Sequence, residues 1–169
     1  MSSIGLISEN DNSTVLAEYT GLNRVATSFQ SEDALEKELI KTLVEQGYER
    51  LSINSEDELI LNLRRQLEKL NNYHFTDGEW DSFFTKVIAN KNDYIIEKTR
   101  LIQEDYKQEI TLDSGEKKNI YLIDKNNIHN NSLQVLNQYV NNDGNYDNRY
   151  DVTILVNGLP LVHVELKKR

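Results

Sequence analysis

The stretch YDVTILVNGLPLVHVELKK, residues 150–168, decides the fold because it predicts two apolar strands that fold back on each other. VTILV (152–156) and LPLVHV (159–164) are rich in β-branched and aliphatic residues, which favour extended backbone. Asn157 and Gly158 lie between them, and this dipeptide is the strongest short-range signal for a hairpin turn. A β-hairpin is therefore predicted at the C-terminal end of the chain.

Further strands are predicted upstream of this hairpin. LQVLNQY (133–139) is typical of a strand, and the Asn-rich segment NNDGNYDNR (141–149) predicts a loop after it. EITL (109–112) and NIYLID (119–124), joined by the turn sequence DSGE, predict a second hairpin.

Residues 31–89 show helical periodicity instead. Ser31 is expected to cap a first helix, and Gly47 to end it, with apolar residues recurring at Leu35, Leu39, Ile40, Leu43 and Val44. EDELILNLRRQLEKLN (56–71) predicts a second helix, through Leu59, Leu63, Leu67 and Leu70, and residues 76–89 a third. The aromatic side chains of the third helix (Trp80, Phe83, Phe84) are expected in the core rather than as a base-stacking platform. Helices first and strands later predict an α+β fold with one mixed sheet.

The domain organisation follows from the same patterns. Residues 1–30 are polar, with VLAEYTGL (15–22) as their only apolar patch, and are expected to form an irregular arm laid over one domain of residues 31–169. An apolar strand so close to Arg169 normally needs a covering element. We therefore expect the native polypeptide to continue and the sheet to be incomplete at its C-terminal end.

Composition restricts the classes of function. No apolar stretch reaches the roughly 18 residues that cross a bilayer, and the N-terminus lacks a signal peptide, so a cytoplasmic protein without membrane contact is expected. The chain has no cysteine, so a metal would be held by oxygen or by the sparse histidines His74, His129 and His163, which favours Mg²⁺ over Zn²⁺. The net charge of −9 argues against strong DNA binding by this chain alone.

Three charged residues flank the apolar hairpin. Asp151 opens its first strand, while Glu165 and Lys167 lie at the end of the second and share one face by strand alternation. Two carboxylates with a lysine suit Mg²⁺-assisted hydrolysis, because the ion takes carboxylate oxygens and the lysine can offset phosphoryl charge. The carbonyl of Leu166 is a further candidate ligand. The other interpretation is that charged residues at strand ends serve solubility, and spacing alone does not separate the two.

The register of the hairpin bears on this site. A regular two-residue turn would pair Asp151 with Val164, placing Asp151 on the face away from Glu165. A shared metal ion therefore requires an odd-length connection or a β-bulge, with Gly158 in the left-handed region.

The residues around this motif resemble a known family. NRYDVTILVNGLPLVHVELKKR, SEDALEKELIKTLVEQGYERL and NIYLIDKNNIHNNSLQVLNQY are similar to the N-terminal endonuclease domain in the R subunit of type I restriction-modification enzymes. The resemblance implies a PD-(D/E)xK nuclease fold with Asp151, Glu165 and Lys167 as catalytic residues, although Tyr150 stands where that motif has proline.

The resemblance also implies cofactors and partners. It implies Mg²⁺-dependent cleavage of double-stranded DNA, with ATP used by motor domains of the full-length protein, and docking on methyltransferase and specificity subunits. A helix with Gln and Tyr usually follows the lysine in this family, so the chain by itself is expected to be weakly active or inactive. The alternative function is a non-catalytic interaction domain that positions the motor and the partner subunits.

Nucleases of this superfamily often add an acidic residue from the first helix. Glu36 lies in the middle of the apolar face of helix 31–46 and is the candidate, with Glu32 second, whereas Glu38 points away. Glu36 can equally be a glutamate favoured by the helix dipole. His163 shares a strand face with Glu165 but is expected to be packed or solvent-facing, and Lys168 and Arg169 either touch phosphate or simply end the chain.

Overall fold

The structure, a computed structural model, describes residues 3–9, 15–20, 31–53, 55–141 and 148–167. Contacts divide the chain into two units, residues 1–31 and residues 32–169. In the first unit, strands β1 (Ser3–Glu9) and β2 (Val15–Thr20) pair antiparallel, with an irregularity between Leu6 and Ser8. The expectation of an irregular conformation was therefore wrong for these residues, which form two strands.

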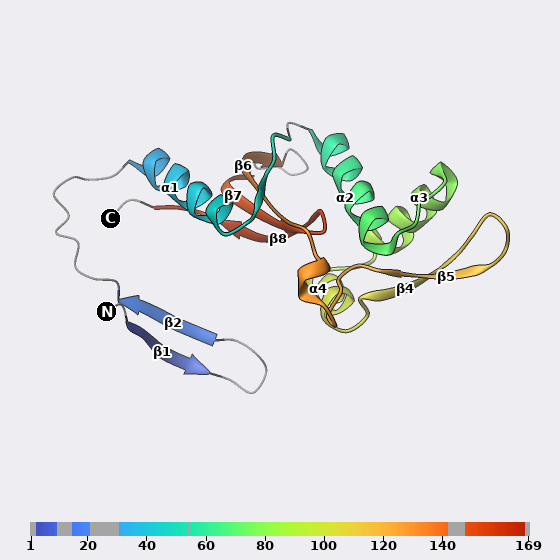
Figure 1. Cartoon of the computed structure of the whole chain (residues 1–169), viewed down its shortest axis with the longest axis horizontal. Coiled ribbons are helices and arrows are strands. Elements are labelled where there is room, and N and C mark those ends of the chain that lie inside the picture. Colours follow the sequence, from blue (N-terminus) through green and yellow to red (C-terminus); the bar gives the residue numbers. More distant parts are fainter. Residues whose placement is uncertain (1–2, 10–14, 21–30, 54, 142–147, 168–169) are drawn as a thin grey trace. The chain divides into compact units, whose positions relative to one another are not determined.

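The second unit is built around a four-stranded mixed sheet in the order β3-β6-β7-β8 (Figure 1). Its strands are β3 (Glu49–Arg50), β6 (Leu133–Asn141), β7 (Asn148–Val156) and β8 (Leu159–Val164). β3 runs parallel to β6, while the β6–β7 and β7–β8 pairs are antiparallel. The predicted α+β fold is confirmed. Most of the predicted loop, residues 142–147, lies outside the described residues.

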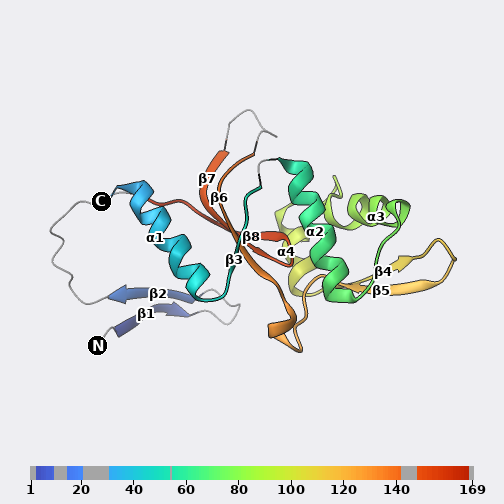
Figure 2. The ribbon, with the colours of Figure 1, turned by 45° about the horizontal axis from the view of Figure 1, so that its top comes forward.

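Helix α1 (Glu32–Glu45) covers one face of this sheet (Figure 2). Ile40 and Leu43 of the helix pack with Val135 of β6 and Val152 of β7 in a buried cluster. As the helical periodicity predicts, Glu36 is buried and Glu38 is exposed. The helix ends before Gly47, whose φ of 96° is the left-handed geometry that a helix stop requires.

The second core lies between helices α2 and α3 and a small hairpin. α2 (Glu56–Asn71) and α3 (Asp77–Phe83) are capped by Ser55 and Thr76, and a π-helical turn, η1 (Phe84–Ile88), extends α3. Strands β4 (Lys107–Thr111) and β5 (Lys117–Tyr121) pair antiparallel beside them. Trp80 and Phe83 are buried with Leu67 and Ile120, which confirms that the aromatic residues form core.

Three features differ from the sequence expectations. β4 and β5 form a sheet of their own instead of joining the mixed sheet. Helix α4 (Ile95–Gln103) was not predicted; none of its residues is fully buried, but Leu101 and Ile102 pack partly buried against the second core. A short 3₁₀ turn, η2 (Ile128–Asn130), precedes β6. Among the described residues, no helix is both long and apolar enough to span a bilayer.

Candidate active site

The hairpin of β7 and β8 has a two-residue turn and one bulge. Near the turn Val156 pairs with Leu159 and Leu155 with Pro160, but beyond it Ile154 pairs with Val162 and Val152 with Val164. Leu161 is thus the extra residue, and it shifts the register by one position. The next residues along the two chains are Asp151 and Glu165, so the bulge brings these two positions opposite each other on one face of the hairpin. The expected bulge and the left-handed Gly158, with φ of 81°, are confirmed.

Asp151 is tied to the other side of the hairpin by a hydrogen bond. Its Oδ2 accepts from the backbone N–H of Leu166 at 2.6 Å, and its residue is only partly exposed. A hydrogen bond to a carboxylate stabilises its charged form and fixes its orientation. The Leu166 amide therefore holds the Asp151 carboxylate next to the segment that carries Glu165 and Lys167. The role of the Leu166 carbonyl as a metal ligand stays a prediction.

Glu165 and Lys167 form an ion pair just beyond β8. The Lys167 Nζ lies 3.2 Å from the Glu165 Oε1, and the two side chains are 76% and 65% exposed. Such an exposed pair contributes little to stability, because water and salt screen it. Breaking this ion pair would therefore cost the fold little stability, so Glu165 and Lys167 can each contact another group.

Glu36 approaches the sheet from the face that α1 covers. Its Oε1 accepts a hydrogen bond of 3.1 Å from the Asn137 Nδ2, and Asn137 pairs with Val152. Asp151 is the neighbour of Val152 in β7 and so faces the other side. Figures 1 and 2 both show the segment after β8 running past the N-terminal end of α1, where Glu32 and Glu36 lie. The structure does not join Glu36 to Asp151 by a contact, and its catalytic role stays a prediction.

His163 faces an apolar pocket rather than the open solvent alone. Its Nδ1 lies 3.0 Å from the Thr153 Oγ1, and both residues line a pocket of about 270 Å³ with Leu63, Leu155 and Leu159. Partial burial lowers the pKa of His163 below its usual value of 6.5. The residue shares the strand face of Glu165, as alternation predicts.

The turn of the hairpin is fixed by the side chain of Asn157, whose burial the sequence did not predict. The Asn157 amide donates to the Leu122 carbonyl at 3.0 Å and to the Asn131 Oδ1 at 2.8 Å, and its oxygen accepts from the Ser132 N–H at 2.8 Å. An Asn-Gly pair signals a turn, but nothing in the sequence shows that the turn is buried. This network anchors the end of the hairpin opposite to the charged residues.

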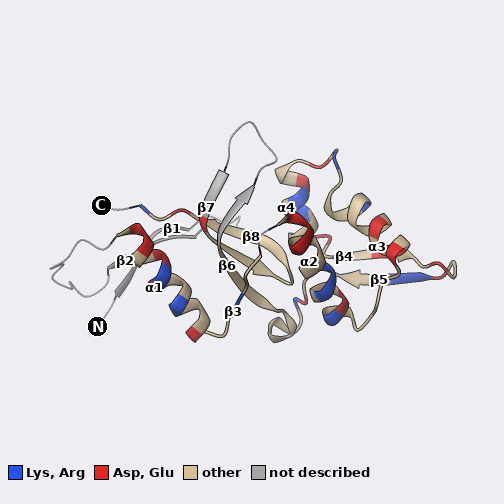
Figure 3. Cartoon of the chain, turned by 90° about the horizontal axis from the view of Figure 1, so that it is seen from above, with Lys and Arg blue, Asp and Glu red and all other residues tan. Residues whose placement is uncertain are grey.

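The surroundings of the site are mixed in charge. Figure 3 shows acidic and basic residues interspersed along α1. A groove beside Glu36 is lined by Lys37, Lys41 and Arg50 together with Asp33 and Glu45. Lys37 and Lys41 pair with acidic residues one turn away, at 2.6 and 3.7 Å. Within the described ranges, no group of three or more histidine, aspartate and glutamate side chains is arranged to hold a metal ion.

Comparisons with known proteins match this chain to restriction enzymes. Residues 29–169 match the family described as type I restriction enzyme R protein N terminus. The chain is 45% identical over 164 residues to the type I restriction enzyme EcoprrI endonuclease subunit of Escherichia coli, covering 96% of this chain and 52% of that protein.

Two staphylococcal proteins are similar over a comparable stretch. The chain is 38% identical over 148 residues to the type I restriction enzyme SsaAORF53P endonuclease subunit of Staphylococcus saprophyticus, which covers 83% of this chain and 15% of that protein. It is also 38% identical over 149 residues to the SauCOLORF180P endonuclease subunit of Staphylococcus aureus, again 15% of that protein. The chain thus spans about half of the first relative and a much smaller part of the other two.

Proposed function

Because the chain belongs to the family of type I restriction enzyme R proteins, as their N-terminal region, we propose that it is an endonuclease domain that hydrolyses double-stranded DNA with Mg²⁺. The observation that carries the proposal is the bulge at Leu161, which brings Asp151 and Glu165 to one face. In the full-length subunit, cleavage would be coupled to ATP-driven translocation, and the protein would act together with methyltransferase and specificity subunits. The relatives' names as endonuclease subunits support this assignment.

The residues present fit a Mg²⁺ ion. Mg²⁺ prefers octahedral oxygen coordination and is commonly held by one or two carboxylates, with waters and substrate phosphate completing the shell. Asp151 and Glu165 provide two carboxylates, and the Leu166 carbonyl is a third candidate oxygen. Two carboxylates and a carbonyl are hard oxygen donors, which suit Mg²⁺ whose shell is completed by water and a substrate phosphate.

The bound ion would polarise the scissile phosphate and lower the pKa of a water molecule beside it. Lys167 would leave its 3.2 Å pair with Glu165 and place its ammonium against the phosphoryl oxygens, where negative charge increases during the reaction. The Leu166 N–H would keep the Asp151 carboxylate oriented while Glu165 changes partner. Each group thus has one role, and none of them is needed to hold the core.

The proposal is tested with Asp151→Asn, Glu165→Gln and Lys167→Gln in the full-length subunit assembled with its partners. Each variant should lower DNA cleavage by about a hundredfold or more, because loss of one charge-stabilising group typically raises a barrier by roughly 3 kcal/mol. ATP hydrolysis and translocation should persist. Cleavage at the normal rate by the Glu165→Gln or Lys167→Gln variant would overturn the assignment.

A matched control comes from a second exposed ion pair. The Lys117 Nζ lies 2.7 Å from the Glu109 Oε1 across β4 and β5, with side chains 67% and 55% exposed. Glu109→Gln and Lys117→Gln make the same changes in charge and should leave cleavage unchanged. Mn²⁺ titration of the purified chain, followed by water proton relaxation, gives a second readout. Binding that survives both the Asp151→Asn and Glu165→Gln changes would favour the non-catalytic alternative, in which the domain only positions other parts of the complex.

A further inference from the structure

Two tyrosines and two lysines form a compact cluster at the edge of the β4–β5 hairpin, which we call the Lys–Tyr cluster (Tyr106, Lys107, Tyr121, Lys125). The Lys107 Nζ lies 5.7 Å from the centre of the Tyr121 ring, and the Lys125 Nζ lies 4.5 Å from that of Tyr106. The two rings are 6.5 Å apart and tilted by 41°. Both lysines are exposed, as is Tyr121, so the cluster presents its ammonium groups to solvent.

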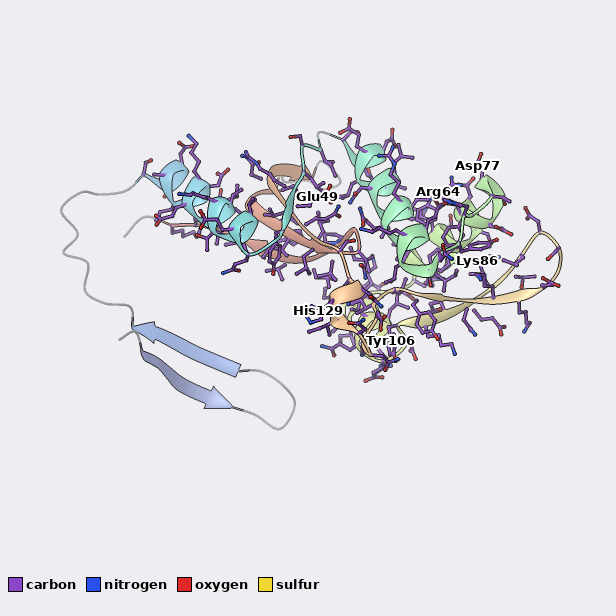
Figure 4. The ribbon with its side chains drawn as sticks, in the orientation of Figure 1. Glu49, Arg64, Asp77, Lys86, Tyr106 and His129 are labelled. Carbon is purple, nitrogen blue, oxygen red and sulfur yellow. The ribbon has the colours of Figure 1, made fainter. Side chains whose placement is uncertain are left out.

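The backbone holds this cluster in place. Lys107 and Tyr121 are directly paired between β4 and β5, and the Leu122 N–H donates to the Tyr106 carbonyl at 2.8 Å. The Asn71 side chain bonds both the N–H and the carbonyl of Tyr121, at 2.7 and 2.9 Å. Tyr106, labelled in Figure 4, immediately precedes β4 and so is fixed by the same pairing. The cluster is therefore ordered before any ligand arrives.

The lysines of the cluster make no ion pair among the described residues, although Lys107 lines a pocket together with Asp93, Glu97 and Asp105. Within the described part of the chain, neither Lys107 nor Lys125 forms an ion pair; Lys125 donates to the Gln103 carbonyl instead. Two nearby carboxylates are already engaged. Glu109 pairs with Lys117, and Asp124 accepts hydrogen bonds of 2.9 Å from the N–H groups of residues 126 and 127.

We propose that the Lys–Tyr cluster binds the phosphodiester backbone of double-stranded DNA, an inference that rests on the proposed nuclease function. Two ammonium groups held on aromatic rings can each bind a phosphate oxygen, and the phenol hydroxyls can donate further hydrogen bonds. Such contacts position DNA without reading its sequence. These contacts would also let an acidic domain hold DNA. The cluster attracts the phosphate backbone at one preformed site, while the acidic remainder of the surface repels it.

The test is the salt dependence of duplex binding by this chain, measured by fluorescence anisotropy in EDTA so that no cleavage occurs. The double variant Lys107→Gln/Lys125→Gln removes two phosphate contacts, so the slope of log K against log salt should become less negative by about 1.8. Over a fourfold rise in salt, the affinity advantage of the wild-type chain should then shrink by about twelvefold. Tyr121→Phe keeps the ring under Lys107 and should leave the slope unchanged.

The matched control is Lys69→Gln/Lys98→Gln, which removes the same charge from exposed lysines of α2 and α4. An equal change of slope in this control would mean that overall charge governs binding and would overturn the inference. So would an unchanged slope in the cluster variant, or the absence of binding by the wild-type chain at low salt. The proposed nuclease function is tested independently. Normal cleavage by the Asp151→Asn variant in the assembled enzyme would refute that function but would not change the result of the binding experiment.

Discussion

Replacing Gly158 with alanine tests how closely the hairpin of the candidate site is packed against helix α2. Gly158 has a φ of 81°, and a Cβ added there would lie 2.6 Å from the Leu63 Cα and 3.1 Å from the Leu63 nitrogen. Both are backbone atoms of a helix and cannot rotate away as a side chain can. The substitution must therefore move either the turn or α2.

The expected cost has two parts. A non-glycine residue in left-handed backbone costs about 1 kcal/mol. Overpacking against a rigid neighbour adds about 2 kcal/mol. For a domain of this size each kcal/mol lowers the Tm by roughly 3 °C, so Gly158→Ala should lower it by about 9 °C.

The assay is thermal unfolding followed by circular dichroism, with Gly115→Ala as the control. Gly115 has a similar φ of 86° but nothing within 4 Å of an added Cβ. Its substitution should show the conformational part alone, about 3 °C. Equal losses in the two variants would show that the contact with Leu63 does not resist the substitution and would refute the reasoning.

Three further predictions follow from named contacts. Asn157→Ala leaves the buried partners of the Asn157 amide unpaired and should lower the free energy of unfolding in urea by about 3 kcal/mol. Asn72 has a similar φ, 46° against 51°, but an exposed side chain, so Asn72→Ala should lower it by about 1 kcal/mol or less. Similar losses in the two variants would contradict the role of the buried network. The hydrogen bond to Glu79 raises the pKa of Tyr73 to about 12, so an absorbance titration of tyrosinate should lose its latest phase in Tyr73→Phe. The stability of the wild-type protein should fall as pH rises above 10, because the folded state keeps the Tyr73 proton that the unfolded state releases. An unchanged titration in the variant would disprove this assignment. Burial lowers the pKa of His163, so the folded state favours its neutral form. The free energy of unfolding should therefore fall as pH drops below about 6.5, and it should fall less steeply in His163→Gln. Parallel plots of stability against pH for the two proteins would contradict this.

Local sequence patterns predicted much of the second unit. Helix 56–71 was predicted with the bounds that the structure gives, because its leucines recur at helical spacing; the structure adds Ser55 as the cap and buries Leu63 and Leu67. The hairpin at Asn157 and Gly158 was predicted because these residues tolerate positive φ, which few others do. Helix α4 and strand β3 were not predicted: α4 is only nine residues long and has just Leu101 and Ile102 packed against the core, and β3 has two residues, too few to show a period.

For the candidate site, the sequence by itself predicted which residues would do the chemistry, and that a shared metal ion needs either an odd-length connection or a bulge. Asp151, Glu165 and Lys167 flank an apolar hairpin, and the parity of residue numbers across a two-residue turn requires one extra residue for the carboxylates to share a face. Only the tertiary structure decided where that residue lies, at Leu161, and which groups surround the site. It placed Glu36 against Asn137, bonded Asp151 to the Leu166 amide and buried Asn157 under residues far away in the chain. The physical reason is range: turn geometry and helical periodicity depend on neighbours within a few residues, whereas burial and hydrogen-bond partners depend on segments that only the folded chain brings together.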